Sequence, residues 1–203
     1  MAKSNIVSVD WTPVAKAQKS CPHKVIQKTA KSILKKTDLA DVPPKKNFSF
    51  GSSKDTNDLY TLAAYLFVFR QYDLCYEICS IYDHVEFGGD YTLWSYIRSL
   101  RCMQIAILAM NGEQDKIDVI LQELKAHELP EENRARVWHT TNKKVLDFEE
   151  AYQETKNSGI RYALMGSAMI YMEFVIMGYF PEKHEQMKTW IKNIFDFLRT
   201  EEK

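Results

Sequence analysis

Glycine, proline and cysteine are scarce in this chain of 203 residues, which holds 7 Gly, 6 Pro and 4 Cys. So few Gly and Pro argue against collagen, a low-complexity filament and a loop-rich β-sandwich. Four Cys do not make a disulfide framework, so we expect reduced thiols and a cytoplasmic protein. The G-x-x-x-x-G-K-[ST], G-x-G-x-x-G, H-E-x-x-H and G-x-S-x-G motifs are all missing. We therefore expect no enzyme, no cofactor and no metal.

Long apolar runs are also missing, apart from residues 162–180. The first 20 residues contain no apolar run of the kind that a signal peptide needs, and Ala2 excludes N-myristoylation. Residues 162–180 carry one charge, Glu173, in a length that could span a bilayer. An acidic residue near the middle of a span costs about 2.5–3.5 kcal/mol. We predict a buried core helix here, in preference to a membrane span or an interfacial helix.

Arginine is absent from residues 1–54, although the whole chain has 27 Lys plus Arg and 27 Asp plus Glu. This segment contains eleven Lys and three Asp, so its formal charge is +8 and that of the remainder is −8. We divide the chain into a Lys-rich N-terminal arm (1–54) with one or two helices and a helical domain (55–203). The lack of Arg weakens recognition of bases and phosphates, so nucleic acid is disfavoured as a partner.

Helical periodicity runs through most of the chain, with apolar residues at i, i+3 and i+4. The expected N-caps are Thr12 for the first helix and Asp55 or Thr56 for the first helix of the domain. No segment alternates for long enough to be a strand, and residues 6–9 form at most one short extended piece. The pattern predicts an all-α fold of seven or eight helices. Helical periodicity is found in nine stretches, and the arm, which contains the first two, is expected to hold one or two helices: 13–21, 23–37, 56–69, 74–84, 91–110, 114–127, 130–156, 160–179 and 182–200.

Two successive helix pairs share a pattern. In the first pair, Ala63 precedes a turn at Tyr72 and Cys75 follows it; in the second, a turn at Gly112 separates Ile105 from Ile117. This arrangement resembles the tetratricopeptide-like helical repeat, in which antiparallel helix pairs stack into a superhelix. Small residues lie at the close helix crossing in that family, and Ala63 and Cys75 match those positions. The resemblance implies irregular antiparallel hairpins stacked as a right-handed superhelix, and no other family motif is present.

Candidate chemical groups are few. Cys75 and Cys79 lie on one helical face with His84 five residues on, but no second Cys/His pair matches, so core filling is favoured over a metal site. Glu173 lies in the most apolar helix, where a charge is costly without a partner. Arg98 and Arg101 are its candidate partners. A structural ion pair, a carboxylate that reaches solvent and a residue in a functional pocket all remain open for Glu173.

Aromatic residues are concentrated between positions 60 and 96, which hold 11 of the chain's 25. Seven of these are Tyr, whose hydroxyl needs a hydrogen-bond partner or water. One helix pair cannot bury rings on every side, so some could line a groove or meet another chain, where Tyr and Trp are favoured. Core packing alone is the other interpretation. The binding-surface candidates are Tyr60, Tyr65, Tyr72, Tyr76, Tyr91, Trp94 and Tyr96.

These observations favour a non-enzymatic interaction module that binds a protein or peptide through an aromatic-lined helical groove. The alternative is a helical small-molecule-binding protein or enzyme with a pocket between hairpins, containing Glu173. A third hypothesis is anion binding, to nucleic acid or a membrane surface, through the Lys-rich arm. The arm could also dock on the acidic body of its own chain or of a second copy, which leaves a homodimer open.

Overall fold

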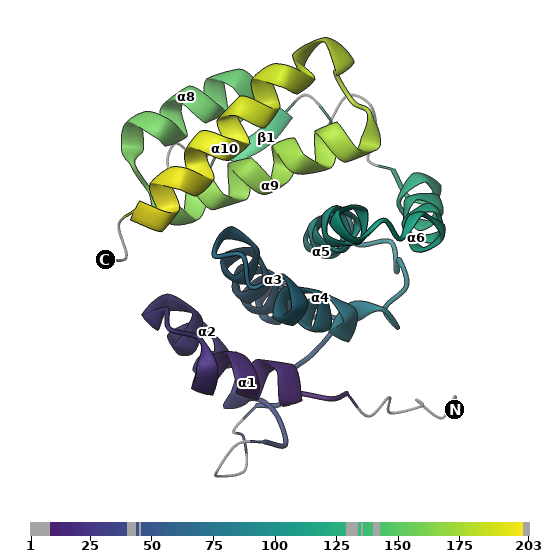
Figure 1. Cartoon of the computed structure of the whole chain (residues 1–203), viewed down its shortest axis with the longest axis vertical. Coiled ribbons are helices and arrows are strands. Elements are labelled where there is room, and N and C mark those ends of the chain that lie inside the picture. The colour runs from purple at the N-terminus through teal and green to yellow at the C-terminus, as the bar shows by residue number, and fades with distance from the viewer. Residues whose placement is uncertain are drawn as a thin grey trace.

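The computed structural model describes residues 9–39, 44, 46–128, 134, 136–139 and 143–200, without the side chains of residues 138 and 139. Within these ranges the chain is mostly helical, with nine α-helices, two short 3₁₀ segments and one two-stranded sheet. Figure 1 shows the helices as layers stacked along the long axis of the molecule, from α1 and α2 at one end to α8, α9 and α10 at the other. The α-helices are α1 (Thr12–Ser20), α2 (Lys24–Leu34), α3 (Ser53–Val68), α4 (Tyr72–Cys79), α5 (Tyr91–Asn111), α6 (Gln114–Ala126), α8 (Phe148–Ser158), α9 (Arg161–Met177) and α10 (His184–Thr200).

Consecutive helices pack against one another. Contacts join α1 to α2, α2 to α3, α3 to α4 and α5 to α6, while α9 pairs with α10. Close approach of α3 and α4 occurs at the two small residues noted in the sequence, because Cys75 Sγ donates to the Ala63 carbonyl oxygen at 3.3 Å. Both side chains are fully buried. The helix pairs are therefore antiparallel hairpins. The 3₁₀ segment η1 (Ser80–Tyr82) follows directly after α4, and η2 (Pro181–Lys183) lies in the turn between α9 and α10.

The N-terminal helices belong to the same hydrophobic core as the rest of the molecule. Val14, Ala17, Ile26 and Ile33 are fully buried in a cluster that continues through α3 to α10. Lys36 Nζ donates to Asp55 Oδ1 at 2.8 Å and to Asp58 Oδ2 at 2.7 Å. The Lys-rich segment is thus packed on α3 within its own chain. Among the described residues, the net charge of the sequence changes sign at residue 54, but the hydrophobic core is continuous across this position.

We expect Ile33→Val to lower the free energy of unfolding by about 0.5–1.5 kcal/mol, the usual cost of removing one buried methyl group. Because the Ile33 side chain packs in the shared core, the whole unfolding transition should move. Chemical denaturation followed by circular dichroism measures this shift, with Val119→Ala at an exposed position of α6 as the control. Two separate transitions, with only the first displaced, would show that residues 1–54 unfold as an independent unit.

Two of the expected N-caps are wrong. Helix α1 includes Thr12, whose backbone N–H donates to Asp10 Oδ1 at 2.8 Å. Helix α3 begins three residues before Thr56, and its N-cap is Ser52, whose side chain accepts from the Asp55 N–H. The carboxylate of Asp55 was free to bind elsewhere, and it accepts from Lys36 Nζ. Capping preferences predict that a polar residue lies near the start of a helix. Tertiary contacts, such as that of Asp55 with Lys36, determine which of the nearby polar residues is the N-cap.

The expected helix over residues 130–156 is wrong at residues 136–139 and 144–147, which form strands, while residues 148–156 are helical as expected. Strands β1 (Arg136–His139) and β2 (Lys144–Asp147) form an antiparallel hairpin in which Val137 pairs with Leu146. Val145 is 50% exposed whereas Leu146 is buried, which is the alternation of a strand with one buried face. Asp147 then caps α8, because its carboxylate accepts from the Glu149 and Glu150 N–H groups. The expected helix start at Pro130 and the extended piece at residues 6–8 lie outside the described residues.

The segment tested for a membrane span folds as predicted into a core helix. Helix α9 buries Met165, Ala168, Met169 and Phe174 against its neighbours. Among the described residues, no helix combines the length and the apolar character that a bilayer crossing needs. All four cysteines are buried free thiols, one in the loop before α2, two in α4 and one in α5. Burial raises the pKa of Cys79 and of Cys102.

Candidate functional site

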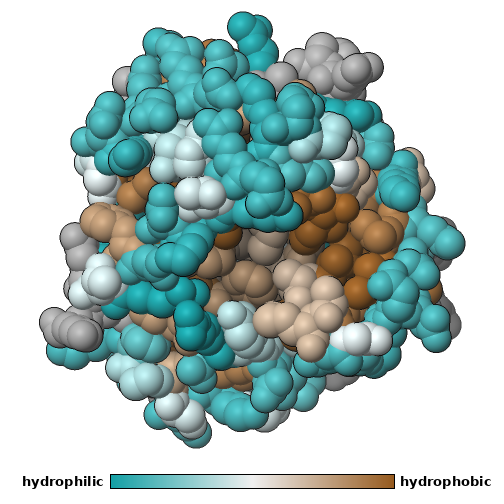
Figure 2. Space-filling model, turned by 45° about the horizontal axis from the view of Figure 1, so that its top comes forward, coloured by the Kyte–Doolittle hydropathy of each residue, from teal (hydrophilic) through white to brown (hydrophobic). Residues whose placement is uncertain are grey.

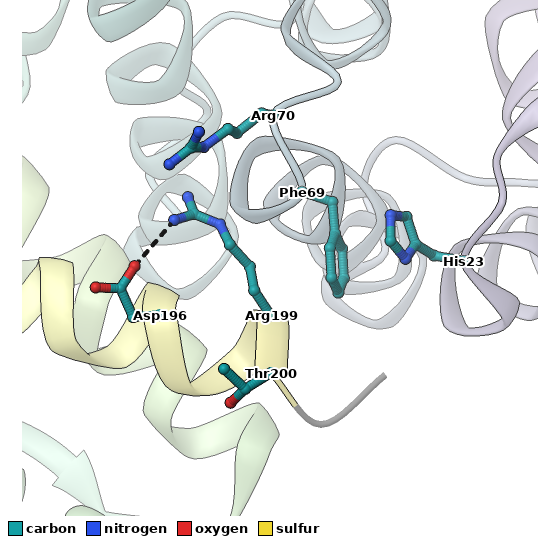
Figure 3. A pocket seen from close by; sticks show the side chains of 6 residues that line it. All are labelled: His23, Phe69, Arg70, Asp196, Arg199 and Thr200. Atoms are coloured by element: carbon teal, nitrogen blue, oxygen red, sulfur yellow. Dashed lines mark hydrogen bonds and ion pairs between the residues drawn. The ribbon is translucent and has the colours of Figure 1, made fainter. Parts of the chain in front are cut away.

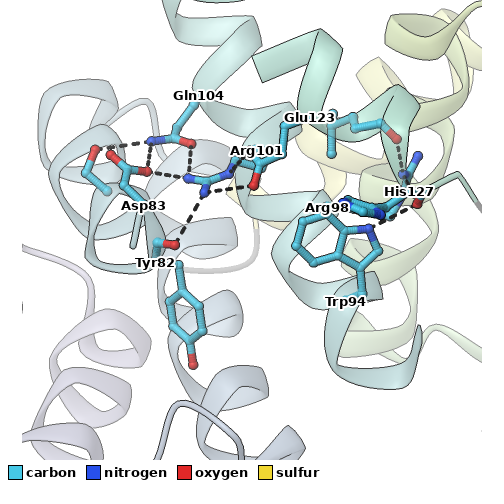
Figure 4. A network of polar contacts seen from close by, with 10 residues as sticks. Tyr82, Asp83, Trp94, Arg98, Arg101, Gln104, Glu123 and His127 are labelled. Atoms are coloured by element: carbon cyan, nitrogen blue, oxygen red, sulfur yellow. Dashed lines mark hydrogen bonds and ion pairs between the residues drawn. The ribbon is translucent and has the colours of Figure 1, made fainter. Parts of the chain in front are cut away.

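Helix α5 carries the long polar side chains of Arg98, Arg101 and Gln104 into the interior. Their spacing of three residues places them along one flank of the helix. They lie between η1 and α4 on one side and α6 and α9 on the other, and Figure 4 shows the network that they form. Buried charges of this kind must be paired and hydrogen-bonded to be tolerated. The partners therefore decide whether this cluster is structural or functional.

Arg101 joins three segments of the chain. Its Nε donates to Glu123 Oε2 on α6 at 2.9 Å, and its Nη2 donates to the Tyr82 carbonyl oxygen at 3.3 Å. Its Nη1 contacts Asp83 Oδ1, which also accepts from Gln104 Nε2 at 3.0 Å. All three nitrogens of this guanidinium group have an acceptor. Arg101 thus ties the turn after α4 to α5 and α6, and Glu173 is not among its partners.

Arg98 is the partner of Glu173. Its Nε donates to Glu173 Oε1 on α9 at 2.7 Å, and the arginine side chain is fully buried. Its Nη1 donates to the carbonyl oxygens of Leu124 at 3.0 Å and His127 at 3.2 Å. Trp94 Nε1 donates to the same His127 carbonyl at 3.1 Å. These carbonyl groups lie at the C-terminal end of α6, where no N–H group of the helix itself can donate to them. Arg98 and Trp94 therefore cap the C-terminus of α6.

Burial and the guanidinium group act on Glu173 in opposite directions. Burial disfavours the carboxylate and raises the pKa of Glu173, while the attraction of Arg98 lowers it, and burial has the larger effect. The Arg98 Nη2 atom has no hydrogen-bond partner within the described part of the chain. Neither of the two surface pockets described below includes Glu173. The pair joins α5, α6 and α9, and its position identifies a structural ion pair.

The structure separates the seven predicted binding-surface aromatics into two groups. Tyr60, Tyr65 and Trp94 are buried in the core and offer little surface to a partner. Tyr72, Tyr76 and Tyr96 are half-buried, and Tyr91 is 42% exposed. Tyr96 packs beside Tyr60, with ring centroids 5.5 Å apart. The candidates are thus spread over several places and do not form one aromatic surface.

Tyr76 lies in a surface groove between α1 and α4, with a volume of about 450 Å³. The hydroxyl group of Tyr76 has no hydrogen bond in the described residues, and burial raises the pKa of this group, which keeps it protonated as a donor. Hydrogen bonds from Thr12 lower the pKa of Asp10, so the opposite rim carries a carboxylate. The groove is lined by Val9, Asp10, Pro13, Tyr76, Glu77, Ser80, Ile81 and His84. Of these residues, only Tyr76 was predicted from the sequence to belong to a binding surface.

A second pocket was missed entirely. It brings Arg70, at the end of α3, to Arg199, near the end of α10, with His23 and Phe69 beside them. The sequence has one unusual feature here. Arg70 stands just after the end of α3, at a position where glycine commonly follows a helix. Arg70 and Arg199 are far apart in the sequence, so no local sequence pattern could predict that they lie close together. No group of three or more His, Cys, Asp and Glu in the described ranges could hold a metal ion.

Apolar side chains also reach the surface elsewhere. Figure 2 shows a face on which polar residues cover the rim and apolar residues line a hollow in the middle. Contiguous apolar surface that is rimmed by polar residues commonly marks an interaction site. The molecule therefore exposes both a groove with carboxylates and an apolar recess.

Fold and site together define an α-helical protein of stacked hairpins, with a buried polar network at its centre and open grooves at its surface. The chain belongs to a family of unknown function, DUF6707, whose family model matches residues 11–162. This match includes α1 to α8 and ends at the start of α9. No curated protein and no solved structure matches the chain.

Proposed function

We propose that this protein is a non-enzymatic interaction module that binds a segment of another protein in the groove between α1 and α4. The observation that carries the proposal is the lining of that groove. Val9, Pro13 and Ile81 supply apolar surface, and Tyr76 adds a ring with an unpaired hydroxyl group in the described residues. Tyrosine is favoured at binding surfaces because it offers apolar area and a hydrogen bond at a small cost in conformational entropy.

Charge narrows the class of partner. Asp10 and Glu77 place two carboxylates at the groove. Lys16 is the cation nearest to Glu77, at 3.8 Å, and both side chains are about half exposed, so this pair is weak. A peptide that carries Lys or Arg beside an apolar anchor would complement both the charge and the apolar lining. A basic, partly apolar peptide is therefore the ligand that we propose.

The stacking of hairpins supports this function, and we further propose that it follows the tetratricopeptide-like superhelix that the sequence resembles. The support is the order of contacts from α1 to α6 and the close crossing at Ala63 and Cys75. Stacked helical hairpins present extended surfaces that suit peptide binding. A solved structure of the protein would test the handedness and the regularity of the stack.

We expect Tyr76→Ala to weaken binding of peptides selected against the wild-type protein by about tenfold or more, the loss typical of a buried aromatic anchor. A displayed peptide library is selected on the wild-type protein, and the affinity of the enriched peptides is measured by calorimetry. Tyr91→Ala, at an exposed tyrosine that does not line the groove, is the matched control.

The selected peptides should be rich in Lys or Arg, and Tyr91→Ala should leave their affinity within about twofold of the wild-type value, as expected for a residue outside the contact. Equal affinity for the Tyr76→Ala protein, or a library without any enriched peptide, would refute the proposed groove.

A further inference from the structure

The pocket at the ends of α3 and α10 has the features of an anion-binding site. Figure 3 shows the guanidinium groups of Arg70 and Arg199 close to each other, with the ring of Phe69 between them and His23. The pocket has a volume of about 510 Å³ and is lined by His23, Phe69, Arg70, Asp196, Arg199 and Thr200. Two like charges repel each other, so their approach requires a stabilising arrangement or a counter-ion.

The one carboxylate in the lining is already engaged. Asp196 Oδ2 accepts from Lys192 Nζ at 2.7 Å, and Asp196 Oδ1 accepts from Arg199 Nη1 at 3.3 Å. The nearby cations, Lys192 foremost, lower the pKa of Asp196, so it is ionised at neutral pH. Three cations therefore surround a single carboxylate. Among the described residues that line the pocket, Arg70 and Arg199 outnumber the one carboxylate, so their net charge is positive.

Arg199 is held in place by the backbone. Its Nε donates to the Val68 carbonyl oxygen at 2.6 Å, which fixes the plane of the guanidinium group beside the end of α3. The side chain of Arg70, in contrast, makes no hydrogen bond or ion pair within the described residues, and it is exposed. One arginine of the pair is thus positioned in advance and the other has its donors free.

The backbone at Arg70 is strained. Its φ angle is 61°, in the left-handed region, and the Gln71 N–H donates to the Leu66 carbonyl oxygen at 2.9 Å, which closes the helix end. Glycine normally occupies this position because it has no Cβ, and Gly112, Gly159 and Gly178 fill it at the ends of α5, α8 and α9. Strain of this kind concentrates at functional sites. A charged side chain stands where stability alone favours glycine.

We propose that this pocket binds an organic phosphate monoester through Arg70 and Arg199. A guanidinium group donates two parallel hydrogen bonds to phosphate oxygens, and a pair of such groups suits a dianion better than a monoanion. Phosphate monoesters are mostly dianions at pH 7. The pocket volume exceeds the space that a bare phosphate group fills and leaves room for the organic part of the ligand. This site is separate from the groove between α1 and α4 and does not depend on the function proposed there.

Phenyl phosphate and phenyl sulfate test the proposal directly, because they share a shape and differ in charge. Calorimetric titration of the full chain at pH 7.5 should show binding of phenyl phosphate that is about tenfold or more tighter than that of phenyl sulfate. Inorganic phosphate should bind more weakly than phenyl phosphate. Absence of phenyl phosphate binding, or equal binding of phenyl sulfate, would overturn the proposal; equal binding of inorganic phosphate would overturn the assignment to an ester.

Arg70→Gly separates binding from folding. This variant should bind phenyl phosphate about tenfold or more weakly, the loss expected for a charge-assisted contact. Its melting temperature should rise by about 2–4 °C, because the left-handed backbone is no longer strained. Lys125→Gln, which removes one exposed positive charge on α6, is the control for net charge and should bind as the wild type does. Unchanged phenyl phosphate affinity in Arg70→Gly would overturn the proposal.

Discussion

Arg98→Met should lower the free energy of unfolding by about 3–5 kcal/mol, the cost of breaking a buried ion pair from one side. The variant leaves the Glu173 carboxylate buried without its cation, and it leaves the Leu124 carbonyl at the end of α6 without a donor. Urea denaturation at pH 7, followed by circular dichroism, measures the loss. A cost below about 1 kcal/mol, the range of exposed ion pairs, would contradict the assignment of this pair as a buried structural one.

The pH dependence of the Arg98→Met variant follows from the pKa of Glu173. Burial raises that pKa above 4.5 in the folded protein, so between pH 4.5 and the raised pKa the folded state keeps a proton that the unfolded state has lost. Stability from this group therefore falls as pH rises from 4.5 through the folded pKa. Without Arg98 the pKa rises further, so the deficit of the variant should grow over this pH range. A deficit that is constant with pH would show that Glu173 does not cause it.

A double variant provides the matched control. Arg98→Met with Glu173→Leu removes both charges and leaves neither group uncompensated, so it should be more stable than Arg98→Met alone. If the two substitutions simply add, the pair contributes no coupling, and the loss in the single variant comes from the α6 carbonyls.

The second large effect is expected at Arg101→Met, with a loss of about 2–3 kcal/mol in the free energy of unfolding. Arg101 makes more hydrogen bonds than Arg98. However, its partners Asp83 and Glu123 are partly exposed, so water can hydrogen-bond to their carboxylates when Arg101 is replaced. The side chain of Asp83 is 52% exposed and that of Glu123 is 31% exposed. Solvent screening reduces what each pair contributes. The same denaturation series, with Lys125→Met as the control for charge, ranks the two arginines.

A larger loss in Arg101→Met than in Arg98→Met would reverse this ranking. It would mean that the number of hydrogen bonds matters more here than the burial of the partner.

The sequence predicted the helices best where a long apolar stripe meets a strong end signal. The helix over α5 was expected at 91–110 and ends at Asn111, where Gly112 caps it in the left-handed conformation. The hairpin at β1 and β2 was missed because its strands are four residues long, and no period can be established over such a length. Val137 pairs with Leu146 and Trp138 pairs with Val145, so apolar residues that suit a helical period lie on two facing strands instead.

The partner of Glu173 could be narrowed to two residues and no further. Arg98 and Arg101 are one turn apart on α5, and both are buried. The direction in which α9 crosses α5 decides between them, and this is a tertiary property without a local signal. The same limit applies to the tyrosines: Tyr60 and Tyr76 belong to the same aromatic-rich segment, but only the packing of the neighbouring helices buries the first and leaves the second in a groove.

The four buried thiols have a practical consequence for studies of how this molecule opens. Cys21 precedes α2, Cys75 and Cys79 lie in α4, and Cys102 lies in α5, so three successive layers each contain a native thiol. A thiol reacts as the thiolate and only when a reagent reaches it, so alkylation requires local or global opening of its layer. Mass spectrometry of alkylated peptides would therefore follow the breathing of each layer in the wild-type chain, without any introduced label.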